Sequence, residues 1–172
     1  MSDTASIAMA QREFWNGEAT RRWVIEQARI DRLMSNVTEA ALVAAAPKPG
    51  ESVLDVGCGT ATTTLRMAET VGPSGCVLGV DISEQQLELA RRRVAAAGAT
   101  RVKLVLDDAA THAFGLDRFD LCFTRFGVMF FVGCLPVRIG KPVDDGKRLS
   151  DPSSCAPSTG IGTGGTRPIQ LE

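Results

Sequence analysis

Glycines and carboxylates that follow short apolar segments are the residues of this chain best suited to hold a ligand. Gly57 and Gly59 follow the apolar segment 52–56, and Asp81 follows a second one, 76–80. A glycine turn between a strand and a helix leaves unpaired amides at the positive end of the helix dipole, facing the ligand. A carboxylate at the end of the next strand can accept both hydroxyls of a ribose. The pattern predicts a site for a cofactor that contains a nucleoside, most simply adenosine.

Alternating strands and helices must position these groups. We expect short strands at 52–56, 76–80, 102–106 and 119–124, and helices at about 61–71 and from Ser83 to just before Gly98. Ser83 and Gln86 have the spacing of a capping box. Such alternation is typical of parallel strands joined by right-handed crossovers, so the fold class predicted is α/β, with half of a doubly wound, Rossmann-like sheet.

The two ends of the chain differ from this central part. Residues 5–46 lack strand alternation and predict helices, in two or three pieces because Gly17 interrupts the pattern. Residues 132–172 are rich in glycine, proline and serine and show no helical stripe. We expect them to form a low-complexity, disordered tail.

Composition favours small molecules as partners. The chain has 172 residues, a formal net charge of −1 and 44% hydrophobic residues, as in one globular domain. No basic face for nucleic acid or anionic lipid stands out, and the longest apolar run is too short to span a bilayer. The five cysteines have no metal-ligand spacing. We expect a cytoplasmic protein without a metal, nucleic-acid or membrane partner, and leave its oligomeric state open.

The chain resembles the class I S-adenosylmethionine-dependent methyltransferases. The resemblance lies in Asp55-Val-Gly-Cys-Gly-Thr-Ala61, Val80-Asp-Ile-Ser83, Leu106-Asp-Asp-Ala109 and Phe119-Asp-Leu-Cys-Phe-Thr-Arg-Phe-Gly127. A nicotinamide-dependent oxidoreductase is less favoured, because the dehydrogenase fingerprint needs glycine where this chain has Thr62. Ala61 stands where the methyltransferase pattern often has a third glycine, and its methyl group should narrow the backbone approach slightly.

The resemblance implies a cofactor, S-adenosyl-L-methionine, and the residues that bind it. They are Asp55, Gly57, Cys58, Gly59, Asp81, Ile82, Asp108, Ala109 and Arg125. Asp81 would bind the ribose and Asp108 the adenine amino group, with Asp107 as the alternative. Arg125 would orient the methionine part or an acidic group of the substrate, or it is a surface arginine.

We name no catalytic residue, because in-line methyl transfer needs alignment and a dry pocket more than an acid or base. Lone His112 lies on a polar connection, where a histidine is more often solvated than catalytic.

The resemblance also implies an architecture, with the strands in the order 3-2-1-4. One domain, 1–131, would contain a helical lid (1–46) and an α/β core (47–131). Phe14, Trp15 and Trp23 would either line that lid or merely pack the helices onto the sheet.

Family-like sequence ends at Phe131, so our hypothesis is that a frame-shift, splice change or truncation replaced the C-terminal half. The functions considered are therefore a methyltransferase of unknown small-molecule substrate and a non-catalytic cofactor-binding remnant.

Overall fold

A four-stranded parallel sheet organises the chain. The computed structural model describes residues 3–114 and 119–130, and the predicted tail lies outside these residues. The strands are β1 (Ser52–Val56), β2 (Cys76–Asp81), β3 (Val102–Leu106) and β4 (Leu121–Thr124). Their order in the sheet is β3-β2-β1-β4, which confirms the predicted order.

The fourth strand is shorter than predicted. Asp120 precedes it and forms a clasp with the first residue of β1, because Ser52 N donates to Asp120 Oδ2 at 2.7 Å and Asp120 N donates to Ser52 O at 2.8 Å. Asp120 thus aligns β4 with β1.

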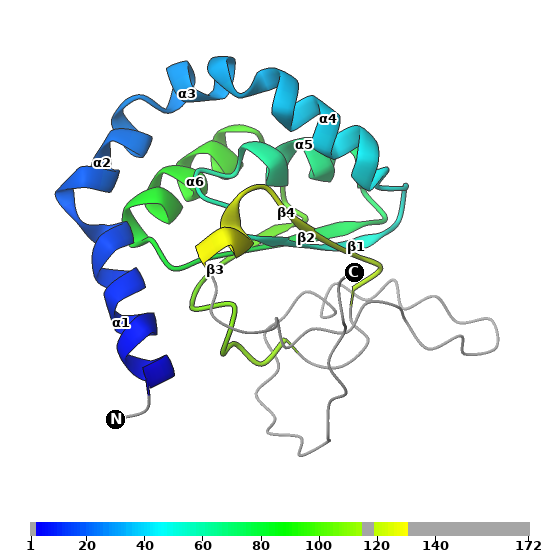
Figure 1. Cartoon of the computed structure of the whole chain (residues 1–172). Coiled ribbons are helices and arrows are strands. Elements are labelled where there is room, and N and C mark those ends of the chain that lie inside the picture. The colour runs from blue at the N-terminus through cyan, green and yellow to red at the C-terminus, as the bar shows by residue number, and fades with distance from the viewer. Residues whose placement is uncertain (1–2, 115–118, 131–172) are drawn as a thin grey trace.

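Helices α5 (Thr62–Val71) and α6 (Glu84–Ala96) connect β1 to β2 and β2 to β3, and both lie on one face of the sheet (Figure 1). Their bounds agree with the predicted helices to within a residue or two. At the start of α6, Gln86 N donates to Ser83 Oγ at 3.4 Å, so the predicted cap at Ser83 is confirmed.

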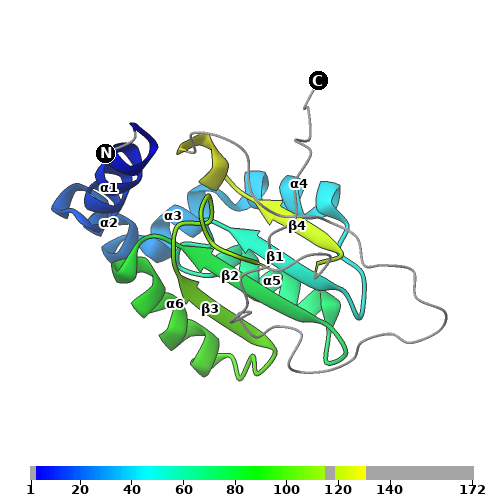
Figure 2. The same cartoon turned by 90° about the horizontal axis from the view of Figure 1, so that it is seen from below.

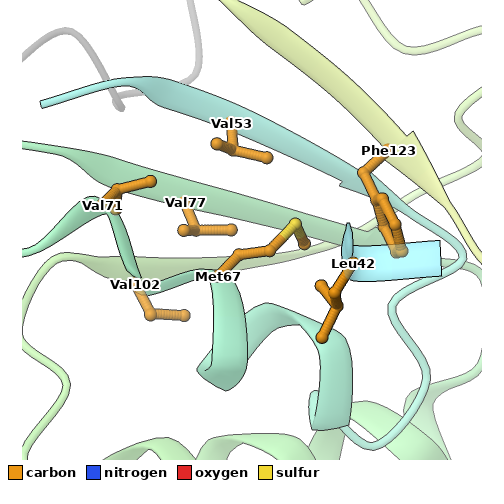
Figure 3. Close-up of a cluster of buried hydrophobic side chains, with 7 residues drawn as sticks. All are labelled: Leu42, Val53, Met67, Val71, Val77, Val102 and Phe123. Carbon is orange, nitrogen blue, oxygen red and sulfur yellow. The ribbon is translucent and has the colours of Figure 1, made fainter. Parts of the chain in front are cut away.

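The hydrophobic core has one layer on each face of the sheet, because successive strand side chains point to opposite faces. The layer between the sheet and the helices contains Leu42, Val53, Met67, Val71, Val77, Val102 and Phe123 (Figure 3). The opposite layer contains Leu54, Val56, Leu78, Val80, Ala109, Phe114 and Phe119. All five residues of β1 are therefore buried, as in a parallel strand covered on both faces.

The N-terminal helices number four in the described chain, more than the two or three predicted. They are α1 (Asp3–Asn16), α2 (Glu18–Ile25), α3 (Gln27–Leu33) and α4 (Ser35–Ala45). The break at Gly17 agrees with the prediction, but those at Glu26 and Met34 carry no glycine or proline signal. At both of these, backbone hydrogen bonds continue across the junction, so the chain bends without ending the helical path.

We call residues 3–33, which form α1–α3, the helical cover. Figure 2 shows it beyond the arrowheads of the strands. Contacts between the end of α1 and the residues at the start of α6 help to hold this first helix in place. Ser83 Oγ donates to Trp15 O at 2.8 Å, Asn16 Nδ2 donates to Ile82 O at 3.1 Å, and Glu84 N donates to Asn16 Oδ1 at 2.9 Å.

A substitution of Gly79, in the middle of β2, tests how closely this sheet is packed. A Cβ at this position would lie 2.9 Å from both Cys58 Sγ and Leu104 Cδ2. We expect Gly79→Ala to lower the free energy of unfolding by about 1–3 kcal/mol through overpacking, measured by urea denaturation. In a Cys58→Ala background the same substitution should cost less, because one of the two atoms it strikes is absent. An equal cost in both backgrounds would contradict the contact.

Candidate cofactor-binding site

A cavity of about 310 Å³ lies at the carboxyl ends of the strands. The segments that follow β1, β2, β3 and β4 all contribute to its lining, and the helical cover closes it. Parallel α/β sheets bind ligands at this edge, and the volume is within the range of small-molecule sites.

The cavity brings together all but one of the residues predicted to bind the cofactor. Those that line it are Gly57, Cys58, Gly59, Asp81, Ile82, Asp108, Ala109 and Arg125. Asp55 does not line it and lies fully buried within β1. The predicted contact between Asp55 and the cofactor stays a prediction.

The amides of the glycine turn are not free, contrary to the prediction. Gly57 N and Cys58 N donate to Val80 O at 2.9 and 3.1 Å, and Gly59 N donates to Asp81 Oδ2 at 2.8 Å. The turn closes against the end of β2 and uses its amides to do so. The amides without an intrahelical acceptor are those in the first turn of α5, where Ala61 provides no side-chain cap. Thr63, in that turn, lines the cavity.

Two glycines in backbone contact shape the turn. Gly57 has φ = +70°, and a Cβ on it would lie 2.7 Å from Gly127 Cα. A Cβ on Gly127 would lie 2.6 Å from Val56 O. Gly127 is not among the predicted site residues, although its position three residues after the fourth strand is a signal that could have found it.

Two other residues that adjoin the cavity adopt a left-handed backbone. Ala61 has φ = 67° and Phe126 has φ = 71°, a conformation that costs non-glycine residues about 1–2 kcal/mol. The consequence of Ala61 in place of glycine is therefore backbone strain at the start of α5, rather than only the narrower approach expected from its methyl group.

Asp81 links the turn after β1 to the turn before α6. Its Oδ2 accepts from Gly59 N and its Oδ1 from Ser83 N, each at 2.8 Å. A carboxylate has about four lone-pair sites, so two remain for a ligand. Burial raises the pKa of Asp81, and the amide bonds oppose that shift. Asp81 therefore stabilises both turns and keeps room for the predicted ribose contact.

Asp55 is a buried carboxylate with one unused oxygen. Its Oδ2 accepts from the hydroxyls of Thr63 and Thr64 at 2.8 and 2.6 Å, while its Oδ1 has no partner in the described part of the chain. Burial raises its pKa to about 6, against the two hydroxyl bonds and the positive charge of Arg125. The hydroxyls, not the backbone amides expected for a simple turn aspartate, hold it.

Asp108 has more free capacity than Asp107 at the end of β3. Asp107 accepts from Asp108 N at 2.8 Å and contacts His112 Nδ1 at 2.7 Å. Asp108 Oδ1 accepts from Ala110 N at 2.9 Å, and its other oxygen is not engaged by the described residues.

His112 is mostly buried and packs edge-on against Phe114 at 4.5 Å between ring centroids, so the expected solvated position is wrong.

Arg125 reaches from the end of β4 to the N-terminal helices. It lines the cavity and donates to Thr38 Oγ1 of α4, so it is not a free surface arginine.

Trp15 and Trp23 also line the cavity, with ring centroids 6.5 Å apart. Phe14 stacks edge-on against Trp15 but is 55% exposed and does not line it.

An ion pair clamps the helical cover to the turn that follows the glycines. Asp31 of α3 contacts Arg93 of α6 at 3.2 Å and accepts from Thr62 Oγ1 at 2.8 Å. Arg93 also donates to Thr60 O at 2.7 Å. Spacing along the chain carries no signal for this cluster, because its members come from three elements far apart in the sequence.

Metal ligands and membrane spans are not found in the ranges 3–114 and 119–130. No group of three or more histidine, cysteine or acidic side chains could hold a metal ion there. No helix in the same ranges is long and apolar enough to cross a membrane.

The sequence model of a family described as "Methyltransferase domain" matches residues 53–134, which contain β1–β4 and most of the cavity-lining loops. The chain is 37% identical over 107 residues to aklanonic acid methyltransferase DauC from Streptomyces sp. (strain C5), covering 60% of this chain and 48% of that protein. Over residues 53–134 the chain is thus similar to methyltransferases.

Other methyltransferases match over shorter stretches of the chain. Demethylmenaquinone methyltransferase from Geobacillus stearothermophilus is 42% identical over 79 residues, covering 46% of this chain and 34% of that protein. A SAM-dependent methyltransferase from Aquifex aeolicus is 25% identical, with a TM-score of 0.47 over 51% of this chain and 46% of that one. The chain thus spans about half or less of the length of these three relatives.

The pH dependence of stability tests the buried Asp55. Its pKa is about 6 when folded and 3.8 as the ordinary value, so folding favours the protonated form and stability falls as pH rises from about 4 to 6. Asp55→Asn does not titrate and keeps a carbonyl oxygen for the threonine hydroxyls. The unfolding free energy of this variant minus that of wild type should therefore increase by about 3 kcal/mol from pH 4 to pH 7. Glu69→Gln, on the exposed side of α5, is the charge-matched control. A gain of the same size in both variants would show that net charge is the cause.

Tryptophan fluorescence tests the clamp at Asp31. The chain has two tryptophans, and both line the cavity from the helical cover. Asp31→Asn removes the charge that Arg93 faces, so we expect stronger acrylamide quenching and a stability loss of about 1 kcal/mol. Glu39→Gln breaks the exposed pair between Glu39 and Arg66, 2.8 Å apart, and should change neither. Unaltered quenching in Asp31→Asn would show that the clamp does not hold the cover.

Proposed function

We propose that this chain binds S-adenosylmethionine in the cavity and transfers its methyl group to a largely apolar small molecule. The observation that carries the proposal is the convergence of the glycine turn, Asp81 and the Asp108–Ala109 segment on one cavity. These three features recognise different parts of a nucleoside, and a site for another ligand would not need all of them.

The adenosine part of the cofactor fits the end of the cavity near β2 and β3. Asp81 retains two lone-pair sites for the ribose hydroxyls, and Asp108 retains a carboxylate oxygen for the adenine amino group. Ile82 and Ala109 supply apolar surface on the lining for the flat base.

The methionine part fits the end near α5 and β4. Its carboxylate would be stabilised by the positive end of α5 and by the guanidinium of Arg125. Asp55, which is fully buried in β1 and does not line the cavity, would favour an ammonium group near the turn through its negative charge. Opposite charges of ligand and protein are therefore matched at this end.

When bound, the cofactor supplies a methyl group on a sulfonium, which is open to in-line attack by a nucleophile. The chain contributes alignment and exclusion of water. Trp15, Trp23 and Ile30 of the helical cover present apolar surface to the cavity, and the clamp at Asp31 holds that cover near the glycine turn. We assign no acid or base, because none of the described groups is required for the displacement.

The cover side of the cavity suggests the nature of the methyl acceptor. It is mainly apolar, with Ile7, Ala8, Trp15, Trp23 and Ile30. The formal net charge of −1 also disfavours nucleic acid. Two relatives are named for aklanonic acid and demethylmenaquinone. We take these two compounds as the first acceptors to test.

Isothermal titration calorimetry tests the cofactor site. We expect the wild-type protein to bind S-adenosylmethionine and S-adenosylhomocysteine but not NAD. Asp81→Asn keeps one acceptor oxygen for the turns but loses the charge that favours the ribose hydroxyls. We expect its affinity for S-adenosylhomocysteine to fall about tenfold or more. Thermal unfolding of both proteins separates a binding defect from a folding defect.

Methyl transfer is measured separately, with radiolabelled S-adenosylmethionine and each of the two acceptors. Transfer to either one supports the enzyme. Cofactor binding without transfer favours the non-catalytic binding protein, and binding of NAD instead would overturn the proposal altogether.

A further inference from the structure

The side-chain oxygen of Gln11 is a buried acceptor that the contacts described so far leave unused. Gln11 Oε1 is buried and has no hydrogen-bond partner in the described part of the chain, and Gln11 lines the cavity. Leaving a buried acceptor without a partner is costly, so native proteins usually pair such a group. A ligand in the cavity that carries an N–H or O–H would supply the missing donor.

Gln11 lies on the face of α1 that the cavity meets. Ile7 and Trp15, one helical turn before and after it, line the same cavity. Glu13, by contrast, is exposed. The orientation of Gln11 is thus set by the helix as a whole and not by one flexible side chain.

The position of α1 decides which part of the ligand Gln11 faces. The end of α1 is fixed to the residues directly after Asp81, because Trp15 O accepts from Ser83 Oγ at 2.8 Å and Asn16 Nδ2 donates to Ile82 O at 3.1 Å. Asp81 and Ile82 belong to the adenosine end of the site. The methionine end lies at α5 and β4, on other elements.

Adenosine has only two kinds of donor, the ribose hydroxyls and the 6-amino group of adenine. The proposed function pairs the hydroxyls with Asp81 and one amino N–H with Asp108, which leaves the second amino N–H without a partner. Resting on that function, we propose that Gln11 Oε1 accepts a hydrogen bond from the 6-amino group of adenine, so that α1 of the helical cover distinguishes adenine from other purines.

This contact gives the cover a part in specificity beyond shielding the site from water. A purine with oxygen at position 6 would face the Gln11 and Asp108 oxygens with a third acceptor, and the three would repel one another. Adenine instead donates to both.

A double-mutant cycle between protein and ligand tests the contact. The ligands are S-adenosylhomocysteine and its 6-deamino analogue, which has hydrogen in place of the amino group. We expect Gln11→Leu to bind S-adenosylhomocysteine about threefold to tenfold more weakly than wild type, as for loss of one neutral hydrogen bond. It should bind the deamino analogue as well as wild type does, or better.

Glu13→Leu, on the exposed side of α1, is the matched control and should bind both ligands as wild type does. Circular dichroism checks that Gln11→Leu keeps its helices. Equal losses for the two ligands, or no loss for either, would overturn the assignment of Gln11 while the cofactor site stands. If wild type binds neither ligand, the proposed function fails and the role of Gln11 fails with it.

Discussion

The turn after β1 depends on three positions that carry no side chain. Gly57 and Gly127 meet backbone to backbone, and Gly79 leaves room for Cys58 of the turn. Thr124 Oγ1, at the end of β4, also donates to Val56 O at 2.9 Å. This bond joins β4 to the residue that directly precedes the turn. These close contacts fix the position of the turn, which forms the floor of the cavity. The amides of the turn form hydrogen bonds that hold the floor in place, without a ligand.

Two buried carboxylates lie in this part of the molecule, Asp81 on the lining of the cavity and Asp55 within β1. Burial raises the pKa of both Asp55 and Asp81, which means that their ionised forms are costly. Arg125 offsets part of that cost for Asp55. A cofactor that carries a sulfonium and an ammonium group would offset more, and this fits the proposed occupant better than an anionic dinucleotide does.

The local sequence pattern predicted most of the sheet but did not predict the bends and contacts of the helical cover. Apolar runs bounded by glycine and proline placed β1–β3 within a residue, and Ser83 marked the start of α6. The bends at Glu26 and Met34 have no glycine or proline beside them, so the sequence gives no signal for these bends. The pairing of Asp31 with Arg93 and the engagement of the turn amides are long-range contacts, which depend on the folded arrangement and leave no trace in spacing.

Loop closure orders the assembly of this sheet. Ser52 and Cys76, partners in β1 and β2, are 24 positions apart, whereas Val56 and Thr124 of β1 and β4 are 68 apart. The chain entropy lost on pairing grows with that separation, and non-local strand pairs form slowly. The β1–α5–β2 unit is therefore the natural nucleus, and β4 joins it late. Gly127 meets Gly57 only where β4 is paired with β1, so the floor of the cavity is complete only after this long loop has closed.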